Sequence, residues 1–174
     1  MLHLKTERLD VIPCSLGIAQ AIAADKSKIE TILAVRVPDD WPAQDLAEFL
    51  PFHAKQLEAD PSLLGWGVWL MIHATERVVI GDVGFKGKPD YEGTVEIGYS
   101  VIPAYRNQGF ASEAAQALVD WVFTQQGVRK IVAECSDDNA PSIRVLQKLG
   151  MKRLKTDGSL LKWGLKRTHE SPET

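Results

Sequence analysis

The feature that most constrains this chain is an amphipathic helix that follows a strand-like segment after a short polar loop. Apolar side chains recur at i, i+3, i+4 and i+7 over residues 111–124, which predicts a helix with one buried face. Residues 94–102 have the composition of a strand, and the loop from Arg106 to Gly109 is polar. The fold must therefore place the N-terminus of a well-formed helix close to the end of a strand.

The rest of the chain predicts a mixed α+β order of elements. Residues 66–73, 78–86 and 94–102 are three strands with short connections, which favours an antiparallel meander. The other expected elements are, in chain order, an extended segment at 2–13, a helix at 16–35 capped by Ser15, a helix at 43–59 that Pro51 breaks or kinks, a strand at 131–136, a helix at 139–149, and strands at 152–156 and 160–166.

Length and composition predict one globular domain. The chain has 174 residues, of which 45% are hydrophobic, so we expect a single domain over residues 1–167 and a disordered polar tail at 168–174. A net charge of -3 argues against nucleic acid or an anionic membrane as a partner. Two cysteines and four scattered histidines predict no metal site. No apolar run is long enough to span a membrane and no signal peptide is apparent, so we expect a cytoplasmic protein.

The loop before the helix at 111–124 has the composition of an anion-binding turn. The first N–H groups of a helix have no intrahelical acceptor, and the helix dipole adds positive potential there. Gly109 removes side-chain bulk so that a phosphate or pyrophosphate can approach the backbone, and Arg106 can add a charge. A plain β–α turn explains the same glycine. Neither a Walker A loop nor a Gly-x-Gly-x-x-Gly pattern is present.

The same loop carries the motif of a known family. Arg106-x-x-Gly109-x-Ala111 resembles the Gln/Arg-x-x-Gly-x-Gly/Ala signature of the GNAT superfamily of acyl-CoA-dependent N-acyltransferases. The likeness continues to the branch of ribosomal-protein N-terminal acetyltransferases, the RimJ/RimL type. It rests on Thr6-Glu-Arg-Leu9, Val95-Glu-Ile-Gly-Tyr99, Pro103-x-Tyr105-Arg106, Ala111-Ser-Glu-Ala114 and the block from Asn139 to Met151, where Met151 replaces the usual Phe.

The resemblance implies a GNAT fold that uses acetyl-CoA as co-substrate and no metal. In that fold the central strands of a mostly antiparallel, twisted sheet, here residues 94–102 and 131–136, splay apart and hold acetyl-CoA between them. A backbone N–H in a bulge near Val101 would polarise the thioester carbonyl. The residues implied to bind acetyl-CoA are Tyr99, Ser100 and Val101 along the pantetheine arm, Arg106, Asn107, Gln108, Gly109, Phe110, Ala111 and Ser112 around the pyrophosphate, and Asn139 and Ser142 near the pantetheine or the sulfur.

Glu96 is the first candidate for the base that takes a proton from the amine acceptor. It lies in the middle of a strand, where burial would raise the pKa of a carboxylate. Strand alternation places it on one face with Gly98 and Ser100, which leaves room for a substrate. An ion pair with a neighbouring Lys or Arg explains Glu96 equally well. Asp82 is the second candidate, with a structural role slightly favoured.

Ser142 is the candidate donor of a proton to the departing thiolate. Related N-terminal acetyltransferases often have Tyr seven residues after the Asn, and Leu146 occupies that position here. A serine in the first turn of a helix is also a common cap, and solvent can protonate the thiolate instead.

The acceptor is expected to be a primary amine that attacks the thioester directly in a ternary complex. Branch resemblance favours a protein or peptide N-terminal α-amine. A small-molecule amine (amino acid, polyamine or antibiotic) and a non-catalytic acyl-CoA-binding module are the alternatives. Trp41 would lie in the acceptor wall, as a lid or as a packed loop residue, and edge strands with this loop could mediate a homodimer. Lys148 and the basic residues at 152–155 could help hold the 3′-phosphate or form a solvated face.

Overall fold

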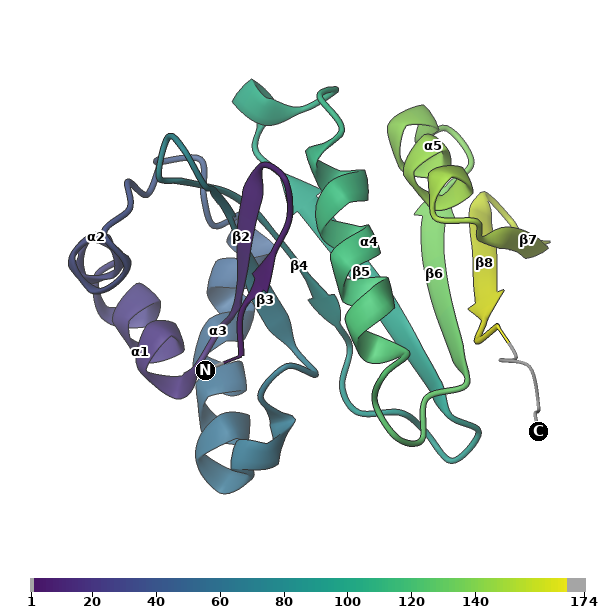
Figure 1. Ribbon diagram of the computed structural model, residues 1–174, viewed down its shortest axis with the longest axis horizontal. Coiled ribbons are helices and arrows are strands. Elements are labelled where there is room, and N and C mark those ends of the chain that lie inside the picture. Colours follow the sequence, from purple (N-terminus) through teal and green to yellow (C-terminus); the bar gives the residue numbers. More distant parts are fainter. Residues whose placement is uncertain (1, 169–174) are drawn as a thin grey trace.

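The computed structural model describes residues 2–168, and within them one mixed sheet is flanked by helices (Figure 1). The polar tail predicted at 168–174 lies outside the described residues apart from Thr168. The strands are β1 (Leu4–Lys5), β2 (Leu9–Pro13), β3 (Val68–His73), β4 (Val78–Phe85), β5 (Thr94–Val101), β6 (Lys130–Ser136), β7 (Lys152–Asp157) and β8 (Leu160–Lys166). The α-helices are α1 (Leu16–Ala24), α2 (Ser27–Leu33), α3 (Gln44–Ala59), α4 (Phe110–Val122) and α5 (Ala140–Lys148).

The strands lie in the order β1-β2-β3-β4-β5-β6-β8-β7 and separate two hydrophobic cores. On one face, α4 buries Ala114, Ala115 and Leu118 against β2 to β6, in the core that also takes Leu146 of α5. On the other face, α1, α2 and α3 pack over the opposite side of β3 and β4. Each face of the central sheet is thus covered by a different set of helices (Figure 1).

The two central strands splay apart, as the family resemblance implies. β5 and β6 are parallel neighbours only from Thr94–Glu96 to Lys130–Val132. Beyond these pairs β5 remains bonded to β4 alone and β6 to β8 alone. No other strand of residues 2–168 pairs with the β6-facing edge of β5 from Ile97 onward. The backbone groups on that edge are therefore available to a ligand.

A bulge lies next to the splay, in β4 and not at Val101 of β5 as predicted. The register between β3 and β4 shifts so that Ile80 is the extra residue, whereas the β4–β5 register is regular through Gly81 and Val101. A Cβ atom on Gly81 would lie 2.2 Å from the carbonyl oxygen of Ser100. Glycine is therefore required there, because it lets the two strands approach beside the site.

Three predicted elements differ from the structure near the N-terminus. The extended segment at 2–13 is the hairpin β1–β2, which turns where the Thr6 N–H donates to the Leu9 carbonyl. The helix predicted at 16–35 is two helices, because the Asp25 carboxylate accepts from the Ser27 N–H and starts α2 in a new direction. α3 continues through Pro51, since the helix gains enough from burying its sheet-facing side to offset one lost hydrogen bond.

Glu113 ties the first turn of α4 to the N-terminal hairpin. Its carboxylate accepts hydrogen bonds from the Thr6 hydroxyl, from the Arg8 N–H (2.8 Å) and from Arg8 Nε (2.8 Å). Burial alone would raise the pKa of Glu113, but these donors outweigh burial and hold the pKa below its usual value. The Arg8 guanidinium also stacks on the Phe110 ring, 4.0 Å from its centroid. The start of α4 is therefore fixed by residues from the other end of the chain.

Replacing Glu113 with Ala should lower the free energy of unfolding by about 2 kcal/mol, because three donors lose a charged acceptor. Urea denaturation at pH 7 measures the change. The control is Gln116→Ala on an exposed position of the same helix, which should stay within about 0.5 kcal/mol of wild type. Equal losses in the two variants would contradict the assigned anchoring role.

Candidate functional site

The N-terminus of α4 has the backbone geometry of an anion-binding turn. Asn107 and Gly109 both have positive φ values, 61° and 85°. This conformation turns the chain sharply into the helix and directs successive N–H groups toward the same side. The Glu113 N–H bonds to the Gly109 carbonyl, so the N–H groups of Phe110, Ala111 and Ser112 precede the first helical bond. They are free to bind an anion.

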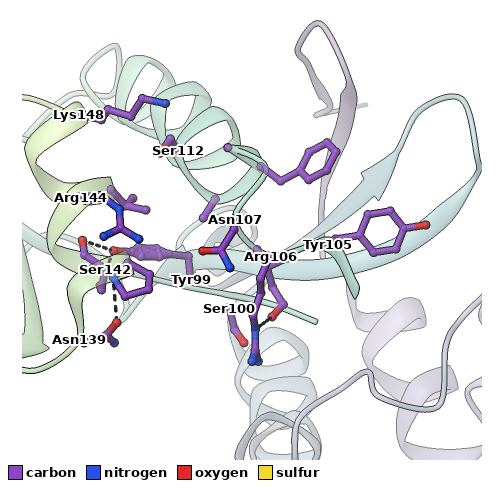
Figure 2. Close-up of a pocket in the computed structure, with 16 residues that line it drawn as sticks. Tyr99, Ser100, Tyr105, Arg106, Asn107, Ser112, Asn139, Ser142, Arg144 and Lys148 are labelled. Atoms are coloured by element: carbon purple, nitrogen blue, oxygen red, sulfur yellow. Dashed lines mark hydrogen bonds between the residues drawn. The ribbon is translucent and has the colours of Figure 1, made fainter. Parts of the chain in front are cut away.

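These N–H groups border a cavity of about 640 Å³, here called the α4–α5 cavity. It occupies the opening between the splayed strands, with α4 on one side and α5 on the other (Figure 2). The cavity is lined by Tyr99, Ser100, Val101, Tyr105, Arg106, Asn107, Gly109, Phe110, Ala111, Ser112, Asn139, Pro141, Ser142, Arg144, Val145 and Lys148. Its polar wall and its length along two helices suit a long anionic ligand.

Most residues that the sequence singles out for acetyl-CoA lie together on this wall. The exception among them is Gln108, whose exposed side chain donates to the Ala104 carbonyl at 3.2 Å. Arg106 lies on the wall, but its Nε donates to the Val101 carbonyl at 2.7 Å and its side chain points away from Asn107 (Figure 2). Arg106 therefore fixes the end of β5. The cations on the wall from α5 are Arg144 and Lys148, whereas residues 152–155 lie on the edge strand β7.

A pair of hydroxyl groups spans the cavity. The phenol of Tyr99 from β5 lies 2.7 Å from Oγ of Ser142 on α5 (Figure 2). Burial raises the pKa of Tyr99 above its usual value, so the phenol keeps its proton at neutral pH. Ser142 is also held through its backbone, since its N–H donates to Oδ1 of Asn139 at 3.1 Å. Asn139 thus caps α5, and the two hydroxyls form a protonated pair at the point where the strands diverge.

A second cavity, of about 510 Å³, lies on the opposite face of the sheet beneath α3 and is here called the α3 cavity. It is lined by Phe49, Phe52, His53, Gln56, Leu63, Trp66, Gly67, Val68, Asp82, Val83, Gly84, Phe85, Lys86, Gly87 and Gly98. Gly98 is the β5 residue that immediately precedes the three β5 residues of the first cavity. The two cavities therefore adjoin the same strand from opposite faces.

Asp82 and Ser100 lie where the two cavities come closest along the paired strands β4 and β5. They are direct cross-strand partners, and Asp82 lines the α3 cavity while Ser100 lines the α4–α5 cavity. Burial raises the pKa of Asp82 to about 6. The indole N–H of the fully buried Trp41 donates to Oδ2 of Asp82 at 2.9 Å and orients the carboxyl group. Trp41 is a packed residue of the loop, which leaves it no part as a lid.

Glu96 lies on the same face of β5 as Gly98 but is already paired. Its Oε2 is 2.7 Å from Nζ of Lys86 on the adjacent strand, and 26% of its side-chain surface is exposed. Glu96 is not among the residues that line either cavity, although Lys86 lines the α3 cavity. In this structure Glu96 therefore forms the ion pair that is one of its two sequence-based interpretations.

The residues of the α4–α5 cavity fit a coenzyme A thioester. The glycine turn offers backbone N–H groups to a pyrophosphate, and the unpaired edge of β5 offers strand-like hydrogen bonds to a pantetheine arm. The model of the acetyltransferase (GNAT) domain matches residues 17–152. The chain belongs to the GNAT acetyltransferase family. This family uses acetyl-CoA as the acyl donor, and its members include named N-acetyltransferases.

Individual relatives agree with this assignment. The uncharacterized N-acetyltransferase YjdG of Bacillus subtilis (strain 168) is 29% identical over 150 residues, which cover 86% of this chain and 89% of YjdG. The ribosomal-protein-S5-alanine acetyltransferase of Vibrio fischeri is 19% identical, with a TM-score of 0.67 over 99% of this chain and 100% of that chain. A RimL ribosomal L7/L12 α-N-protein acetyltransferase solved with coenzyme A is 17% identical, with a TM-score of 0.65 over 95% of this chain and 98% of that chain. These structures show the same fold.

Among residues 2–168, no helix is both long and apolar enough to cross a membrane. Within the same range, His, Cys, Asp and Glu side chains form no group of three or more that could hold a metal ion.

Sequence reasoning missed two contributions to the site. Arg8 lies beside the glycine turn, since a Cβ atom on Gly109 would lie 3.3 Å from Arg8 Nη2. The Tyr99 phenol reaches α5, although the family resemblance implies only a backbone contact of Tyr99 with the pantetheine arm. Helical or strand spacing cannot reveal either contact, because each depends on how distant elements pack. The Thr6–Leu9 likeness to the branch was the one available signal for Arg8.

Asp82→Asn should stabilise the protein at neutral pH. Because burial raises the pKa of Asp82 to about 6, the wild-type protein loses stability as pH rises from about 4 through about 6 and the carboxyl group ionises. The amide stays neutral and still accepts the Trp41 hydrogen bond, so at pH 7 the variant should gain about 1–2 kcal/mol. Thermal unfolding at pH 4.5 and pH 7.5 measures the difference, which should be clearly smaller at the lower pH. A variant less stable than wild type at pH 7.5 would contradict the raised pKa.

Proposed function

We propose that this protein transfers the acetyl group of acetyl-CoA to the N-terminal α-amine of a peptide or protein, by direct attack within a ternary complex. The observation that carries the proposal is the cross-strand pair Asp82 and Ser100, of which Ser100 lines a cavity suited to acetyl-CoA and Asp82 lines a second cavity on the other face, where an amine would bind. The likeness of the motifs to the RimJ/RimL-type branch favours a peptide α-amine as acceptor.

Asp82 is the proton acceptor that the geometry supports best. An α-amine is largely protonated at neutral pH, so a base must take its proton before attack. Asp82 faces the α3 cavity, and with its pKa near 6 it is ionised at pH 7 yet more basic than an ordinary carboxylate. Glu96 is the competing candidate, but its carboxylate is paired with Lys86 and lines neither cavity. The two carboxylates can be separated by substitution.

The Tyr99–Ser142 pair supports a proton donor on the other side of the reaction. When the amine nitrogen bonds to the acetyl carbon, the carbon–sulfur bond breaks and the thiolate of coenzyme A needs a proton. The Tyr99 phenol is protonated at neutral pH and lines the donor cavity with Ser142. Solvent could re-protonate Tyr99 through the Ser142 hydroxyl. Leu146, at the position where relatives often have Tyr, is buried in the core.

The function is tested by following thiol release from acetyl-CoA with peptides of varied N-terminal residues and with small amines, while mass spectrometry locates the acetyl group. Acetylation of a peptide α-amine is the expected result. Turnover with small amines alone would replace the peptide by a small-molecule acceptor. Acetyl-CoA binding by calorimetry without turnover of any acceptor would favour a binding module instead.

Asp82→Asn should lower kcat/KM on the order of 10²-fold while acetyl-CoA binding is unchanged. The matched variant Glu96→Gln should keep turnover within about threefold, because its carboxylate is committed to Lys86. In the wild-type protein kcat/KM should fall as pH drops below about 6, where Asp82 becomes protonated. Loss of turnover in Glu96→Gln with normal turnover in Asp82→Asn would assign the base to Glu96.

Tyr99→Phe should lower kcat on the order of 10²-fold if the phenol supplies the proton to the thiolate. Ser142→Ala should cost less, because it removes only the partner of the phenol. Steady-state kinetics with saturating acetyl-CoA measures both. An unchanged kcat in Tyr99→Phe would mean that solvent protonates the thiolate.

A further inference from the structure

The walls of the α3 cavity are unusually rich in exposed aromatic surface. Phe49 and Phe52 of α3 are 39% and 57% exposed, and their ring centroids lie 5.9 Å apart. Trp66 and Phe85 also border the cavity, but their rings pack with Trp121 of α4 in the core on the other face of the sheet. Large apolar side chains that remain exposed along a cavity indicate a site for an apolar group of a ligand.

The floor of the same cavity is made of backbone. Gly84 of β4 and Gly98 of β5 are direct cross-strand partners, so two neighbouring positions of the sheet carry no side chain. Gly84 must be glycine, since a Cβ atom there would lie 2.1 Å from the Gly67 carbonyl oxygen. A Cβ atom on Gly98 would meet nothing within 4 Å. Packing of the protein itself therefore does not require glycine at position 98, and its absent side chain leaves space in the cavity.

Charged groups mark the two ends of this floor. Asp82 and Ser100 lie at the end nearest the α4–α5 cavity, and the Lys86–Glu96 ion pair lies at the other end. Between them the cavity offers aromatic rings and glycine backbone. An amine held near Asp82 would therefore place its neighbouring substituent over Gly98, in the cavity that Phe49 and Phe52 line.

We infer that the acceptor carries an aromatic or other bulky apolar side chain next to its amine, and that Phe49, Phe52 and the open space at Gly98 select it. This inference rests on the proposed acetyl transfer and names the class of acceptor: peptides that begin with Phe, Tyr, Trp, Leu or Met. One small polar first residue would leave the aromatic walls in contact with water.

The test uses peptides that differ only in their first residue (Phe, Leu, Ala, Ser or Asp), together with phenethylamine. Wild-type kcat/KM should be at least about tenfold higher for Phe and Leu than for Ala, Ser and Asp. Gly98→Val should fill the space without a clash and lower kcat/KM for the Phe peptide about tenfold, with a smaller effect on the Ala peptide. Phe52→Ala should raise KM for the Phe peptide several-fold.

Tyr91→Ala is the matched control, because Tyr91 is an aromatic side chain that is 96% exposed outside the cavity. It should leave the preference unchanged. Acetyl-CoA affinity should be the same in all variants. Equal kcat/KM for all five peptides would overturn the inference while the proposed function stands. Turnover of phenethylamine without any peptide would keep the aromatic selection and overturn the peptide acceptor. A strong preference for the Phe and Leu peptides that survives both Gly98→Val and Phe52→Ala would also overturn the inference.

Discussion

The site depends on the point at which the hydrogen-bonded pairing between β5 and β6 ends. β5 and β6 pair in parallel for only three residues each, and from Ile97 onward the edge of β5 faces open space. The same divergence separates α4 from α5, which creates the cavity between them and lets the Tyr99 phenol cross to Ser142. Unpaired backbone groups inside a sheet are costly in free energy. A ligand that forms hydrogen bonds with the open edge of β5 satisfies these groups as an added strand would.

The α4–α5 cavity brings together most of the residues that the sequence singles out because the parts that form it are local. The strand at 94–101, the glycine turn and the amphipathic helix follow one another directly, and their geometry is set by neighbouring residues such as Asn107 and Gly109. The splaying strands, the antiparallel meander and the α5 cap at Asn139 also agree with expectation. Contiguous segments with strong periodicity are the kind of structure that sequence patterns specify.

The α3 cavity, which we propose for the acceptor, could not be predicted in the same way because it is assembled from distant segments. Burial raises the pKa of Asp82, and the indole N–H of Trp41, from a loop before α3, orients its carboxyl group. The sequence favours Glu96 as the base because a carboxylate in a central strand suggests burial. Its pairing with Lys86 depends on the β4–β5 register, which no local pattern reveals. The bulge at Ile80 and the continuation of α3 through Pro51 are likewise decided by tertiary packing.

The anchoring of Glu113 has a consequence for how the protein folds. The residues that hold the first turn of α4, Thr6 and Arg8, are separated from Glu113 by 107 and 105 positions in the sequence. Contacts between such distant residues form only after much of the chain has collapsed, because closing so long a loop costs entropy. The helix α4 can begin to form early from its own periodicity. The first turn of α4, in contrast, becomes rigid only when the N-terminal hairpin docks. We therefore expect the anion-binding turn to form late in folding, together with docking of the hairpin.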